Sequence, residues 1–284
     1  MKHSTARVGA LAVLGLTVMA MGMATGRAQT GQNGQNDESR PSLTQPKPPE
    51  PPKDAKPVAT PEDNDYQAIF DARNGEPQHV IELGEAFMVK YPDSKYGIGV
   101  DSILTPAYMG TDQFDKMVNA GSKVLQMDPD DVDILPLLAW AIPRRVSAKT
   151  PDGAQQLQKA QAWARHGIEL LSALTKPENL DQAAFEKAKN EKLSMCHDGL
   201  GVVDIKTGRY DDAITEITQA MQLGGEPDLV DDFLLGVAQE ATNHFPDAIA
   251  SFNKCATDGP VQQQCKNGID DTKKKAAKSE EAPK

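Results

Sequence analysis

The chain has 284 residues, with 30 Lys and Arg against 41 Asp and Glu, and its formal net charge is −11 at pH 7. Such an acidic balance argues against nucleic acid as a partner, because contacts to phosphates need clustered Lys and Arg. Aromatic residues make up only 5% of the chain, so no large aromatic hot spot identifies a partner.

Residues 1–28 have the pattern of a secretory signal peptide. Lys2 and Arg7 precede the uncharged stretch 8–23, and small residues flank a cleavage position after residue 28. The 16 uncharged residues are fewer than the roughly 20 that a membrane helix needs. We therefore expect cleavage, no integral membrane span, and a periplasmic or secreted protein; an uncleaved anchor is the alternative. No cysteine precedes Cys196, which excludes lipidation at a new N-terminal cysteine.

Cleavage would make the protein more acidic. The first 28 residues carry three positive charges and no negative ones, so removing them changes the net charge from −11 to −14. Residues 29–60 follow as a linker with almost no apolar side chain and a Pro-rich second half. Such a composition predicts disorder or an extended polyproline II conformation. The linker is either a passive spacer or a docking arm.

The folded region is expected over 61–262, as helix pairs. Thr60 and Pro61 suit the N-cap and first position of a helix over 62–73. A second helix is predicted over 78–90, and a second pair over 98–131. In the third pair, the helix 132–142 is expected to stop at Pro143. A polar connector over 144–153, with Arg144, Arg145 and Lys149, then leads to a helix over 154–174. Helical character resumes from 180 to about 205.

Two stretches, 35 residues apart, repeat each other without a gap over 22 residues. Leu-Gly-Val recurs at 200–202 and 235–237, an aromatic residue at Tyr210 and Phe245, and Asp-Ala-Ile at 212–214 and 247–249. Gly208 and Asn243 stand at matching positions and tolerate the left-handed conformation that ends a helix. The spacing predicts helix–turn–helix units that bury their apolar faces only by stacking on one another.

This repeat resembles the tetratricopeptide repeat (TPR) family. The second copy matches the family pattern at Leu235, Gly236, Phe245, Ala248, Phe252, Cys255 and Pro260. In the first copy the proline is displaced to Pro227, and the family's early Trp is absent from both. The resemblance implies an all-α, TPR-like solenoid of about five helix hairpins plus a capping helix; an ordinary helical bundle is the alternative. The turn 91–96 (Tyr-Pro-Asp-Ser-Lys-Tyr) is similar to turns in TPR proteins of the Gram-negative cell envelope.

The C-terminal residues 263–284 are predicted to be the capping helix and a tail. Cys255 ends a repeat helix and Cys265 lies early in the cap, within plausible reach of a disulfide if the turn between them folds back. The alternative is two small buried cysteines, and Cys196 is expected in the core.

Motifs for catalysis or metal binding are absent from the sequence. Cys196 and His197 are adjacent in a predicted helix and point about 100° apart, which makes a poor ligand pair. Carboxylate pairs such as Asp211-Asp212 and Asp231-Asp232 fall at helix starts, where they complement the helix dipole. We therefore expect no enzyme, no cofactor and no metal.

Two functions are consistent with these features. The first is a non-catalytic scaffold in the bacterial cell envelope that binds a peptide or protein segment of an envelope complex on the concave face. In the TPR family this face comes from the first helix of each hairpin, which implies these residues: Met195, Asp198, Val202, Ile205, Lys206, Val230, Phe233, Val237, Glu240 and Ala241. The second is binding of a small molecule or cell-wall fragment, or a role as an accessory subunit of an envelope enzyme.

Overall fold

The computed structural model describes residues 59–178, 180–225 and 228–281, and all regular secondary structure in these ranges is α-helical. The predicted signal peptide, nearly all of the linker and Pro227 lie outside the described residues. The helices are α1 (Pro61–Ala72), α2 (Pro77–Lys90), α3 (Gly97–Gly110), α4 (Phe114–Met127), α5 (Ile134–Arg145), α6 (Pro151–Ala173), α7 (Gln182–Thr207), α8 (Tyr210–Gly224), α9 (Leu229–Ala241), α10 (Phe245–Cys255) and α11 (Gln262–Glu280).

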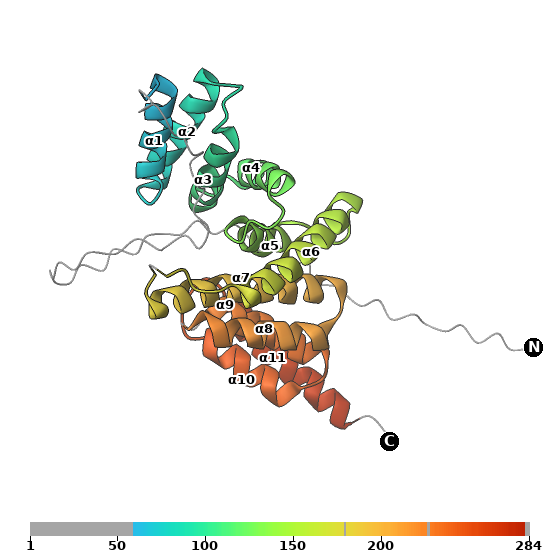
Figure 1. Ribbon diagram of the computed structural model, residues 1–284. Coiled ribbons are helices and arrows are strands. Elements are labelled where there is room, and N and C mark those ends of the chain that lie inside the picture. Colours follow the sequence, from blue (N-terminus) through green and yellow to red (C-terminus); the bar gives the residue numbers. More distant parts are fainter. Residues whose placement is uncertain (1–58, 179, 226–227, 282–284) are drawn as a thin grey trace, which may run out of the picture.

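The helices form hairpins stacked in chain order, from α1 and α2 at one end to α9 and α10 at the other, with α11 covering the last pair (Figure 1). This arrangement confirms an all-α solenoid. We call α1, α3, α5, α7 and α9 the first helices, and their partners the second helices. Among the described residues, no helix is long and apolar enough to cross a membrane.

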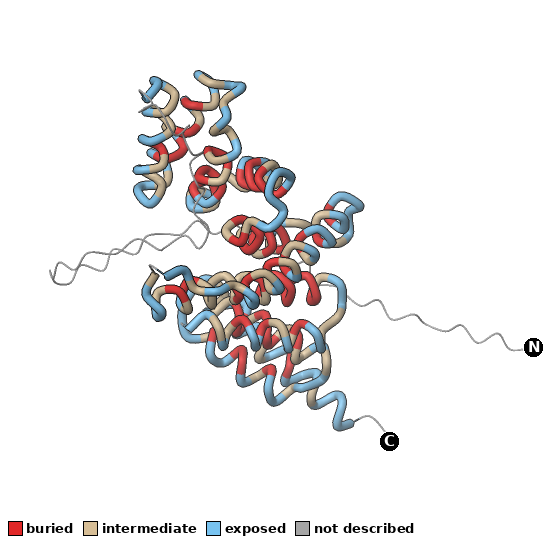
Figure 2. Tube along the Cα trace, viewed as in Figure 1, coloured by how far each residue is buried: buried red, intermediate tan, exposed pale blue. Residues whose placement is uncertain are grey.

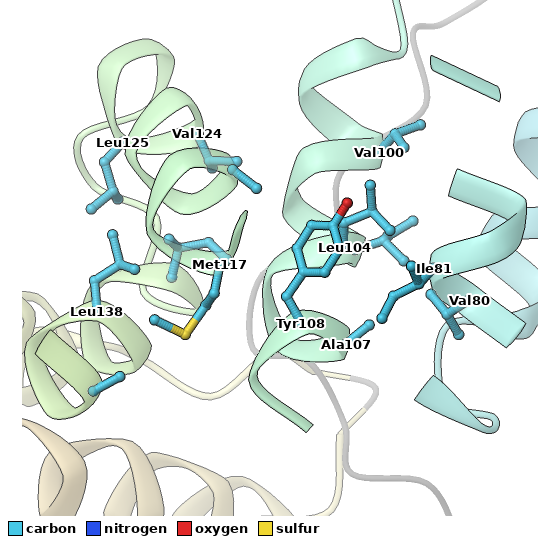
Figure 3. Packing of buried hydrophobic residues seen from close by; sticks show 14 of the residues in the cluster. Val80, Ile81, Val100, Leu104, Ala107, Tyr108, Met117, Val124, Leu125 and Leu138 are labelled. Carbon is cyan, nitrogen blue, oxygen red and sulfur yellow. The ribbon is translucent and has the colours of Figure 1, made fainter. Parts of the chain in front are cut away.

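The core is a series of local clusters rather than one centre (Figure 2). The first cluster joins α1 to α6, and Figure 3 shows Leu104 and Tyr108 of α3 packed between Ile81 of α2 and Met117 of α4. Further clusters join α7 to α6, α8 to α9, and α10 to α11. Each hairpin therefore buries its apolar face mainly against its neighbours, as a solenoid requires.

The repeated hairpins have the packing that their sequence predicts. Gly201 lets α8 approach α7 so closely that a Cβ there would collide with Ile217. Gly236 does the same for Phe252, whose ring would lie 2.7 Å from an added Cβ. The turns end as expected, because Gly208 (φ 79°) and Asn243 (φ 64°) both adopt the left-handed conformation.

The prediction that Pro143 stops a helix is wrong, since α5 continues to Arg145. A proline has no N–H, so the carbonyl of Ala139, four residues earlier, loses its donor within the helix. The backbone of α7 packs against this carbonyl at Gly199, where any Cβ would collide with the Ala139 oxygen. Helix α5 continues past Pro143 while the α7 backbone, at Gly199, packs closely against the Ala139 carbonyl.

The predicted polar connector over 144–153 is also shorter than expected. Residues 146–150 alone join α5 to α6, because Thr150 caps the N-terminus of α6 and Pro151 takes its first position. Arg144 and Arg145 therefore belong to the last turn of α5. Arg145 pairs with Asp112 in the α3–α4 turn, so two of the three connector charges lie on a helix and have partners.

The turn 91–96 fastens the second helix pair to α1. Tyr91 donates to Asp65 (2.9 Å), Ser94 to Glu62 (2.6 Å) and Tyr96 to Asp63 (2.5 Å). The Tyr96 hydroxyl, followed by the Thr60 backbone, holds the pKa of Asp63 well below its usual range. Thr60 and Asp63 also form the capping box of α1. This turn thus has a structural role in the first hairpin.

The C-terminal helix α11 packs on α10 and α9 and runs to Glu280, so this helix takes up most of the predicted cap and tail. Cys255 and Cys265 are joined by a disulfide, with 5.9 Å between their Cα atoms. Gly268 lies against the Phe252 ring, so α11 covers the last repeat helix.

Candidate protein-binding face

Polar contacts follow the line where the first helices α5 and α7 meet. Lys192 pairs with Asp133, Arg144 with Asp198, and the Lys206 ammonium donates to the Val146 carbonyl (2.7 Å). We call these three contacts the polar seam. Because residue numbers increase together along it, α5 and α7 run parallel, as the first helices of successive hairpins do.

Arg144 is the centre of the seam. Its Nη1 donates to the Trp140 carbonyl (2.9 Å), and its guanidinium lies 4.2 Å from the centre of the Trp140 ring. Its Nη2 donates to Asp198. The side chains of Arg144 and Asp198 are only 15% and 6% exposed, so this ion pair is largely shielded from solvent, whereas the Trp140 residue is half-buried.

Asp231, in the first turn of α9, extends the seam to the next first helix. Burial, followed by the charges of Asp198 and Asp228, raises the pKa of Asp231, and Arg144 acts in the opposite direction. Three consecutive first helices therefore contribute Arg144, Asp198 and Asp231 to one cluster of charges.

Lys206 is the third positively charged side chain of the polar seam, and its pKa is shifted. Burial and the nearby positive charge of Arg144 lower its pKa. A lysine held this way positions the connector 146–150, because its ammonium is bonded to the Val146 carbonyl.

The structure buries three of the predicted binding residues. Val202 and Ile205 lie in the cluster that joins α7, α8 and α9. The carboxylate of Asp198 forms an ion pair with Arg144. These three residues are therefore largely covered in this conformation. The physical reason is that α7 has 26 residues and packs against α5, α6, α8 and α9, so less of its surface is open than in an isolated hairpin.

The remaining predicted residues have mixed positions. Half-buried Val230, Phe233 and Val237 pack against the apolar clusters under α9. Glu240 accepts hydrogen bonds from Thr272 and Lys275 of α11, so its carboxylate is already bound by the capping helix. The three others are Met195 and Lys206, which are half-buried, and Ala241, which is exposed.

Sequence reasoning missed Trp140, Arg144 and the role of Asp231. A signal was present, because Trp140 and Arg144 have the four-residue spacing of one helix face, but the predicted helix ended before Pro143 and left Arg144 in the connector. Asp231 was interpreted only as a helix-start charge. Its buried position beside a second carboxylate depends on α7 and α9 coming together, which no local pattern encodes.

The described residues contain no group of three or more His, Cys, Asp or Glu side chains arranged to hold a metal ion. His197 Nδ1 lies 2.7 Å from a Glu216 oxygen of α8. The neighbouring Cys196 is buried against α6, and burial raises the pKa of its thiol to about 12. These two side chains therefore face different helices, and the thiol stays protonated and unreactive.

A shallow hollow of about 240 Å³ lies beside the connector, between α6 and α7. Its lining is largely apolar, and the polar groups come from two glutamines and a threonine: Ala148, Ala154, Leu157, Gln158, Gln161, Val203 and Thr207. These lining residues are all uncharged, in contrast to those of the polar seam.

Comparison with solved structures finds several similar chains. No family model matches the chain, and no curated protein matches it. The crystal structure of a thermophilic TPR protein from Thermus thermophilus is similar, with 14% identity over 74% of this chain and 98% of that chain and a TM-score of 0.41. A similarity of this extent does not transfer a function to this chain.

Proposed function

We propose that the protein is a non-catalytic scaffold that binds a protein segment on the face built by its first helices. The observation that carries this proposal is the junction of α5 and α7, where half-buried Trp140 is stacked by Arg144 beside the polar seam. Trp and Arg are the residue types most enriched among interface hot spots. Solenoids of helix hairpins also provide the extended surfaces that such partners need.

The charge of the chain favours a basic or amphipathic segment as the partner. The net charge is −11, and −14 without residues 1–28. Complementary charge speeds encounter and excludes acidic competitors. We further propose that this binding takes place in the bacterial cell envelope, since the first 28 residues have the pattern of a secretory signal.

Site-specific photo-crosslinking of the full-length chain in cells tests the binding face. A photoreactive residue would replace Met195 or Ala241 on the first helices, and exposed Thr218 or Asn253 on the second helices as matched controls. We expect an adduct with one dominant protein from the first-helix positions and none from the controls. Adducts from the control positions alone would contradict the proposed face.

The location is tested by the intact mass of the protein from the envelope fraction. Export with cleavage predicts a chain that begins after residue 28. A full-length mass in the cytoplasmic fraction would contradict an envelope role while leaving the binding face testable by the crosslinks.

Binding of a small molecule or cell-wall fragment is the second candidate. The hollow beside the connector favours it, although few of its groups are polar. If crosslinks at Ala154 or Gln158 capture carbohydrate-containing material and those at Met195 and Ala241 capture no protein, this second function replaces the first.

A further inference from the structure

The contact between α7 and α9 contains two buried carboxyl groups. Asp198 lies in the middle of α7 and Asp231 in the first turn of α9, and these residues are 4% and 6% exposed. In each, Oδ1 is buried and has no hydrogen-bond partner among the described residues. Buried polar atoms are nearly always hydrogen-bonded. Oδ1 of Asp232 is a third exception among the described residues, but it lies 3.4 Å from the Lys254 ammonium, so it is the Asp198 and Asp231 pair that needs an explanation.

The charges around the pair do not balance if both groups are ionised. From α5, Arg144 pairs with Asp198. From α7, Lys206 is directed to the Val146 carbonyl. From α9, Asp228 adds a further negative charge near Asp231.

The other charged groups of α9 have partners elsewhere. Asp232 lies 3.4 Å from Lys254 of α10, and Glu240 is bound by Lys275 of α11. On α7, His197 is directed to Glu216 of α8. One arginine thus faces two carboxyl groups, which repel each other strongly in a medium of low dielectric.

We propose that Asp198 and Asp231 share one proton when α7 and α9 are packed together, and that losing this proton loosens the contact between the fourth and fifth hairpins. An O–H of one carboxyl group donates to an oxygen of the other, which removes one negative charge and gives both carboxyl groups a hydrogen-bond partner. The solenoid then contains a pH-dependent joint.

The direction of the pH effect follows from the bound protons. Burial and the neighbouring Asp198 raise the pKa of Asp231 to about 8, whereas an unfolded Asp has a pKa of about 3.9. Between these values the folded state binds a proton that the unfolded state has lost, so stability falls as pH rises. The folding equilibrium constant falls by at most about tenfold per pH unit from this group, and the effect ends above the folded pKa.

The proton itself is tested in the unaltered full-length protein. The infrared C=O stretch of a protonated carboxylic acid is expected at about pH 7, well above the usual range of Asp pKa values, and should disappear in Asp231→Asn. No such band in the wild-type protein would overturn the proposal without any variant having to fold.

The joint is tested by hydrogen exchange of α9 amides at about pH 6 and about pH 9, on either side of the raised pKa, after correction for intrinsic exchange rates. The wild-type protein should lose protection in the first turns of α9 at the higher pH, and Asp231→Asn should not. Asp232→Asn is the matched control, because it removes the neighbouring buried acid on the same helix, which faces Lys254 instead. Equal protection of the wild-type protein at both pH values, or the same pH response in Asp231→Asn, would overturn the joint.

Discussion

Gly199 shows how one residue lets two helices meet. It lies where α7 crosses the Ala139 carbonyl of α5, and Pro143 has left that carbonyl without its donor in the helix. The contact is between backbones, so neither partner can move aside by rotating a side chain. The position therefore requires glycine for close approach rather than for an unusual backbone conformation.

Replacing Gly199 by Ala should destabilise the protein by about 2–3 kcal/mol, since overpacking against rigid atoms forces the backbone to shift. Urea unfolding of the two proteins at one pH would measure the difference. Gly97→Ala is the matched control, because its Cβ would meet only the Met88 Cε at 3.9 Å. Equal transition midpoints for Gly199→Ala and wild type would show that α5 and α7 do not approach as closely as described.

The polar seam is also a residue-scale feature. Arg144 and Asp198 are 54 positions apart in the chain and form a largely buried pair. Such a pair contributes little to stability by itself, but it fixes which groups can face each other where the helices meet. The stacked Trp140 joins this pair to the surface on which we place the partner.

At the scale of elements, the disulfide fastens the capping helix. Cys255 ends α10, and Cys265 lies ten positions further on, in the first turns of α11. The loop that they close is short, so the restriction of the unfolded chain is modest. Packing of Gly268 against Phe252 supplies the rest of the attachment.

Reducing the disulfide should lower the free energy of unfolding by about 2–3 kcal/mol. Intact mass should rise by two hydrogens on reduction, and thermal unfolding with and without reductant measures the cost. Cys196→Ala should leave the response to reductant unchanged, because Cys196 is a free buried thiol. Two free thiols at 255 and 265 in protein purified without reductant would contradict the prediction.

At the scale of the whole molecule, the series of core clusters predicts uneven stability. Each hairpin depends mainly on its neighbours, so the stability of the solenoid is close to a sum of local terms. Disturbance at one end should therefore weaken the nearest hairpin most.

Ending the chain after Pro260 should reduce hydrogen-exchange protection in α9 and α10 far more than in α1 to α4. The loss of α11 exposes Phe252, which is 2% exposed in the intact protein. The double variant Cys255→Ala and Cys265→Ala retains α11 and separates the effect of the disulfide from that of the helix. Uniform loss of protection along the chain would mean that the solenoid unfolds as a single unit instead.

Much of the fold was predictable because its signals are local. The 35-residue repeat, the caps at Thr60 and Gly208, and the glycines at 201 and 236 act within one hairpin or between adjacent helices. The continuation of α5 past Pro143 was not predictable, because it depends on the α7 backbone that packs against the Ala139 carbonyl.

The site was predictable only in outline. The sequence by itself determined that helix hairpins stack into a solenoid, since repeated small and apolar positions act through short-range packing. Only the tertiary structure decided which parts of the first helices remain open. It buried Val202 and Ile205, engaged Glu240 with α11, and brought Arg144, Asp198 and Asp231 together. The physical reason is that burial and charge pairing between distant residues depend on how three helices meet, and a pattern within one helix does not contain that information.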